Sequence, residues 1–132
     1  MKTKISERFE RFNKYDSLEN SNRFISACMR IVDMCSHNQN YHVAIIAHSK
    51  FWRKSFMECL IEYMMENDIF DFQYYYNTNE SVLFSNGSVI QCFPVNEGIR
   101  GRRFHYAFVE IDVNTEYIDT CIKPLLREYN RT

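Results

Sequence analysis

The stretch from Asn86 to Asp112 constrains the fold of this chain more than any other. It begins with Asn86-Gly87, the strongest short-range signal for a β-hairpin turn. It ends with an apolar run, Ala107-Phe108-Val109, that is followed by two acids, Glu110 and Asp112. An apolar strand that ends in a carboxylate is typical of nucleotide-binding α/β sheets, where the acid holds Mg²⁺. An ordinary buried strand with an acidic end also explains these residues, and the residue pattern alone favours it.

A second apolar run, residues 43–48, predicts a strand that is covered on both faces, as in parallel sheets. The aromatic-rich segment from Phe70 and the runs on both sides of Asn86-Gly87 predict a hairpin over residues 70–93. Apolar residues spaced three and four apart predict helices between these runs and after Thr115. The sequence therefore predicts an α/β fold with parallel core strands 43–48 and 106–112 and a hairpin 70–93, packed by three to four helices.

Residues 2–15 are highly charged, with Phe9, Phe12 and Tyr15 between the charges. This spacing predicts a helix with a thin apolar stripe. The segment has no apolar run typical of a central strand, so we expect none there.

The order of the motifs resembles the ATPase domain of the large terminase subunit, the motor that packages DNA into phage heads. The resemblance covers residues 19–129, and the matching segments follow one another as they do in that family. These segments are the strand 43–48, the turn Asn86-Gly87-Ser88, the loop motif Ile99-Arg100-Gly101, the Walker B strand 106–112 and the segment Ile122-Lys123-Pro124-Leu125-Leu126. The resemblance implies a partial RecA-like or terminase-like sheet.

The chain departs from that family at the nucleotide site. The family's phosphate loop has a Gly-Lys-Thr sequence one helix ahead of strand 43–48, and this chain has Asn22, Arg23 and Phe24 there, without a glycine. Glu110 falls at the Walker B acid, but the second acid, Asp112, shares its face of the strand and cannot replace an adjacent carboxylate. We interpret Asn22, Arg23, Glu110 and Asp112 as a degenerate nucleotide site with no catalytic residue and no cofactor.

Two groups of basic residues are candidate sites for an anion or a partner. The first, here called the basic turn, opens the helix after strand 43–48 and opposes the helix dipole; it consists of Lys50, Arg53 and Lys54. The second, here called the arginine loop, precedes strand 106–112; it consists of Arg100, Arg102 and Arg103. Clustered arginines bind phosphate or carboxylate groups. Solvated surface charge explains both groups as well.

Composition limits the remaining possibilities. The 132 residues predict one domain, 1–132, and 45% apolar residues exclude a disordered chain. The net charge is −1, so any contact with DNA must be local. The five cysteines follow no disulfide or zinc pattern, which indicates reduced thiols and no metal site. No membrane span or signal peptide is recognisable, and we expect the cytoplasm of the host cell.

Three functional hypotheses follow. The first is a catalytically inactive terminase-like phage protein that binds a protein or DNA partner, in DNA packaging or as an anti-defence inhibitor of a host factor. The second is a divergent nucleotide hydrolase using Arg23, Glu110 and Asp112. The third is a small nucleic-acid-binding module using the arginine loop and the basic turn. Because strand 106–112 lacks the family's flanking strands, we expect it to be an exposed edge that forms a homodimer or binds a partner.

Overall fold

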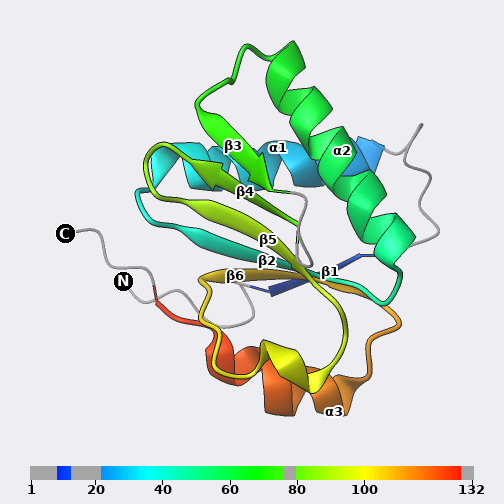
Figure 1. The fold of residues 1–132 in the computed structure, drawn as a ribbon. Helices are drawn as coiled ribbons and strands as arrows, with labels where there is room; N and C mark the ends of the chain where they lie inside the picture. Colours follow the sequence, from blue (N-terminus) through cyan, green and yellow to red (C-terminus); the bar gives the residue numbers. More distant parts are fainter. Residues whose placement is uncertain (1–8, 13–21, 76–79, 129–132) are drawn as a thin grey trace.

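The computed structural model describes residues 9–12, 22–75 and 80–128, and shows a mixed six-stranded sheet between two helical layers (Figure 1). The elements, in chain order, are β1 (Phe9–Phe12), α1 (Asn22–His37), β2 (His42–Ile46), α2 (Lys50–Glu66), β3 (Phe72–Tyr75), β4 (Ser81–Phe84), β5 (Val89–Phe93), η2 (Glu97–Ile99), β6 (Tyr106–Glu110), α3 (Thr115–Tyr117), η3 (Ile118–Ile122) and η4 (Lys123–Leu125). In Figure 1, α1 and α2 lie on one face of the sheet, and α3 lies on the other with the turns that follow it.

The strand order is β1-β6-β2-β5-β4-β3. The first four strands in this order run parallel, and β4 and β3 are antiparallel to their neighbours. The predicted α/β fold is therefore confirmed. Both predicted core strands are present and adjacent. β2 begins one residue before the predicted range 43–48 and ends within it, β6 lies inside 106–112, and the predicted hairpin region holds β3, β4 and β5.

The predicted helix over residues 2–15 is wrong for its described part. Phe9–Phe12 form β1, which pairs parallel to β6 with Phe9 beside Ala107 and Phe12 beside Glu110. This polar strand is stable because its charged side chains have partners. Glu10 accepts a hydrogen bond of 2.6 Å from the hydroxyl of Tyr106 and forms an ion pair with Arg30 of α1.

The presence of β1 also overturns the prediction of an exposed edge on β6. β6 lies between β1 and β2, so its backbone pairs on both sides. Among the described strands, the two outer ones are β1 and β3. A homodimer or partner complex therefore does not form through the edge of β6.

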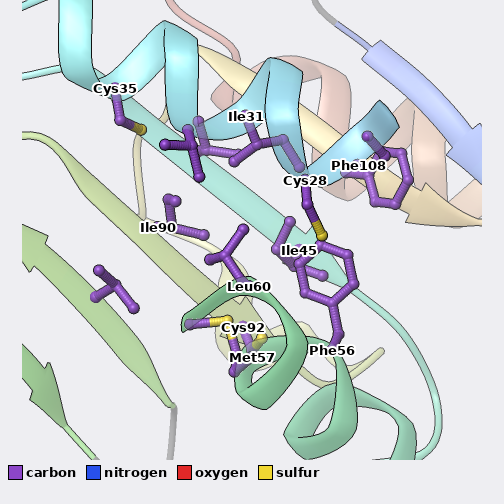
Figure 2. Packing of buried hydrophobic residues seen from close by; sticks show 14 of the residues in the cluster. Cys28, Ile31, Cys35, Ile45, Phe56, Met57, Leu60, Ile90, Cys92 and Phe108 are labelled. Atoms are coloured by element: carbon purple, nitrogen blue, oxygen red, sulfur yellow. The ribbon is translucent and has the colours of Figure 1, made fainter. Parts of the chain in front are cut away.

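Alternating side chains of β2 and of the residue after it, Ala47, enter two separate hydrophobic clusters. Val43, Ile45 and Ala47 pack under α1 and α2, and Ala44 and Ile46 pack against the C-terminal helical turns. Figure 2 shows the first cluster, where Ile31 of α1 and Leu60 of α2 meet the sheet. Burial on both faces explains why the sequence of this strand is apolar without alternation.

The predicted Asn-Gly turn is present, and it docks onto the end of α1. Gly87 has a φ of +87°, a left-handed conformation that glycine adopts without strain. The side-chain amide of Asn86 donates to the carbonyl of Cys35 over 2.8 Å. The buried hydroxyl of Ser88 donates to the carbonyl of Asn38 and accepts from the amide of Tyr41. The turn thus joins the hairpin to the α1–β2 connection.

The last predicted helix is broken into short turns. α3 begins at Thr115 as expected, and the helical turns end at Leu125. Pro124 lies in the final turn, where its missing amide hydrogen ends the regular helical bonding.

Candidate functional site

The carboxyl ends of β1, β6 and β2 meet at one edge of the sheet, here called the carboxyl edge. Functional groups of open α/β sheets collect at such an edge. Glu110 ends β6, and His48 and Ser49 follow β2 there. The predicted site residue Glu110 therefore lies beside the β2–α2 connection.

Glu110 points inward at this edge. Its side chain is 1% exposed, and its Oε2 accepts a hydrogen bond of 2.8 Å from the backbone amide of His48. Burying a carboxylate is costly unless it is hydrogen-bonded, so this contact is part of what stabilises the position. The bond joins the end of β6 to the β2–α2 connection.

Arg11 of β1 lies beside the same strand end. One of its terminal nitrogens, Nη2, donates to the backbone carbonyls of Glu110 at 3.3 Å and Val113 at 2.6 Å, and also to that of Ile111. A guanidinium group suits this role because it carries several donors and a permanent positive charge. Sequence reasoning missed Arg11, because its four-residue strand has no apolar signal that would have identified it.

The remaining residues of the predicted nucleotide site are only partly described. Asp112 is exposed in the turn after β6, separate from the buried Glu110. Asn22 and Arg23 begin α1, but their side chains lie outside the described residues, as does the connection 13–21. The expectation that no strand precedes this helix is wrong, because β1 precedes it and lies directly beside β6. β1 therefore stands before α1 in the chain and beside β6 in the sheet.

The three residues of the basic turn have different surroundings. Arg53 donates from Nη1 to the carbonyls of Ala47 at 2.6 Å and His48 at 3.0 Å, so it satisfies the end of β2. Lys50 and Lys54 are exposed at the start of α2. Of the three basic residues, Arg53 thus bonds to the chain itself, and the two lysines are exposed.

The three residues of the arginine loop also differ in their contacts. Arg100 forms an ion pair with Glu97 at 3.7 Å. The guanidinium of Arg102 lies 5.7 Å from the centre of the Phe93 ring, a cation–π contact. Arg103 is exposed. Two of the three arginines thus have partners within the loop region.

The cysteines lie mostly in the core. Cys28, Cys35, Cys92 and Cys121 are buried free thiols, and Cys59 is partly exposed. Burial raises the pKa of Cys28 to about 12 and also raises the pKa of Cys35 and Cys92. Such thiols stay protonated at neutral pH and are poor nucleophiles and poor metal ligands.

Within the described ranges, no group of three or more histidine, cysteine, aspartate or glutamate side chains is placed to hold a metal ion. None of the described helices is both long enough and apolar enough to cross a membrane. No family model and no curated protein matches the chain. The likeness to terminases therefore rests on the motifs in the sequence.

Proposed function

We propose that the chain is a catalytically inactive terminase-like phage protein that acts in the host cytoplasm by binding a protein or DNA partner. The observation that carries this proposal is the state of Glu110. A Walker B acid must face the nucleotide and its Mg²⁺. Glu110 is instead 1% exposed, and its Oε2 accepts a hydrogen bond from the amide of His48.

The contacts of Arg11 support the same conclusion. Its guanidinium donates to the backbone carbonyls of Glu110, at the end of β6, and of Val113 in the turn after it. Internal contacts of this kind stabilise a fixed strand end. A fixed end suits a scaffold that presents surfaces to a partner, either in DNA packaging or in the inhibition of a host factor.

Nucleotide titration separates this proposal from a divergent hydrolase. We expect no binding heat in calorimetry with ATP and Mg²⁺, and no phosphate release above the level of buffer. The matched variant is Glu110→Gln, which keeps the side-chain volume and an acceptor oxygen but removes the charge. Micromolar binding of nucleotide, or a release of phosphate that is lost in Glu110→Gln, would overturn the proposal.

The binding role itself needs a second experiment. We expect a tagged copy of the chain to retain a specific protein or DNA from phage-infected cells through high-salt washing. Recovery of no stable partner would count against a binding role.

The nucleic-acid alternative predicts affinity that weakens steeply with salt. Arg100 contacts Glu97 and Arg102 contacts Phe93, so we replace both of them together with the exposed Arg103. If the arginine loop binds nucleic acid, the triple alanine variant should lose binding to duplex DNA in fluorescence anisotropy. Unchanged anisotropy in that triple variant would exclude the arginine loop as the contact.

A further inference from the structure

The exposed side of α2 carries its charges in the order that opposes the helix dipole. A helix favours acids in its first turn and bases in its last turn, and α2 has neither. Its exposed charges, spaced four residues apart in one row, are Lys50, Lys54, Glu58, Glu62 and Glu66. This order is unfavourable for the isolated helix. The row is positive along its first third and negative along the rest.

Apolar groups accompany both halves of this row. Phe51, between the two lysines, is 80% exposed, the largest value among the exposed apolar side chains described. Beside the glutamates, Ile61 and Met65 of α2 and Tyr74 of β3 line an apolar groove of about 450 Å³ whose remaining lining residues are the three glutamates of the row. An exposed aromatic ring with a basic rim and an apolar groove with an acidic rim therefore lie on one helix.

We propose that two copies of the chain associate through α2, with the two helices antiparallel about a two-fold axis. Phe51 of each copy enters the groove of the other, and the lysines of each copy lie opposite the glutamates of the other. A two-fold interface requires a self-complementary surface in which each contact occurs twice. A parallel pair would place lysines against lysines, so only the antiparallel arrangement fits the row.

The spacing along α2 suits this arrangement. Phe51 precedes Ile61 and Met65 by ten and fourteen residues, or roughly 15–21 Å along a helix that rises about 1.5 Å per residue. The two aromatic contacts would therefore lie near the two ends of the paired helices, with the charged row between them. Because the glutamates repeat every four residues, each lysine faces a glutamate in either of two registers one turn apart.

The second copy is favoured over another occupant because both complementary halves belong to the same helix. A basic and apolar peptide would fill the groove but would leave Phe51 and the two lysines unexplained. This interface differs from the β6 edge, which β1 covers. The inference goes beyond the proposed function and does not depend on it.

Sedimentation velocity and light scattering over a range of concentrations test the interface. We expect a reversible dimer for the wild-type chain, and Phe51→Ala should raise its dissociation constant by at least about a hundredfold, because each dimer loses two buried rings. Ile25→Ala is the matched control, since Ile25 is an exposed apolar residue of α1 and should leave the dimer unchanged. A monomeric wild-type chain, or equal effects of both variants, would overturn the proposal.

Charge reversal gives a sharper test. Lys50→Glu/Lys54→Glu makes the row wholly acidic, and Glu58→Lys/Glu62→Lys makes it mostly basic. Each variant alone should be monomeric, and an equimolar mixture should form a heterodimer, because every contact of the row pairs opposite charges in the register that places residue 50 opposite residue 62. Circular dichroism checks that each variant is folded. Folded variants that dimerise alone, or that fail to associate when mixed, refute the antiparallel arrangement. A monomeric wild-type chain that binds a basic apolar peptide in the groove would show that the groove belongs to another partner and would overturn the dimer.

Discussion

Gly87 allows a quantitative test of the turn that docks onto α1. Its φ is +87°, and a Cβ at this position would lie 2.1 Å from Oδ1 of Asn40. Gly101 has a similar φ of +85°, but a Cβ there would meet no described atom within 4 Å. Replacing each glycine with alanine therefore separates backbone strain from steric contact.

Left-handed backbone costs an alanine about 1 kcal/mol, and both Gly87→Ala and Gly101→Ala carry this penalty. At Gly87 the exposed side chain of Asn40 must also leave its position, which costs roughly another 1 kcal/mol. The free energy of unfolding should thus fall by about 2 kcal/mol for Gly87→Ala and about 1 kcal/mol for Gly101→Ala. With a urea m value of roughly 2 kcal/mol per M, the unfolding midpoints should fall by about 1 M and about 0.5 M.

A second substitution checks the cause. Asn40→Gly removes the oxygen that the new Cβ would meet, and glycine suits the φ of 56° at that residue. Gly87→Ala combined with Asn40→Gly should therefore recover about 1 kcal/mol in a double-mutant cycle measured by urea unfolding and circular dichroism. Equal losses for the two alanine variants, or a cycle with no coupling, would refute the steric argument.

Three further predictions concern buried groups. Ser88→Ala removes the hydroxyl that bonds the amide of Tyr41 and the carbonyl of Asn38, and should lower the free energy of unfolding by about 2–3 kcal/mol in urea titration; an unchanged midpoint would contradict this. Burial raises the pKa of Cys92 above its usual 9.0, so the folded state keeps a proton that the unfolded state loses. The contribution of this protonated thiol to the free energy of unfolding is complete below pH 9 and falls by about 1.4 kcal/mol per pH unit above pH 9. Cys92→Ala should therefore flatten the alkaline slope of stability against pH, and an unaltered slope would contradict the role of Cys92. Ellman's reagent should label Cys59, which is partly exposed, before the buried Cys92, and equal rates would show that the core opens freely.

The sequence by itself determined the elements whose stability comes from apolar burial. Strand β2 has a continuous apolar run because both of its faces are covered, and β6 follows the same rule until it ends at Glu110. The Asn86-Gly87 turn was also readable, since few residues tolerate its backbone. These features depend on local composition, which a sequence displays directly.

Only the tertiary structure decided what the polar side chains do. Arg11 and Glu10 stabilise β1 because carbonyls after β6, Tyr106 and Arg30 provide partners distant in the sequence. Glu110 is turned inward because the amide of His48 lies beside it. Local periodicity reports which residues avoid water, but a hydrogen bond between residues far apart in the chain has no local signature. The candidate site and the polar strand β1 therefore required the tertiary structure, whereas the apolar strands β2 and β6 did not.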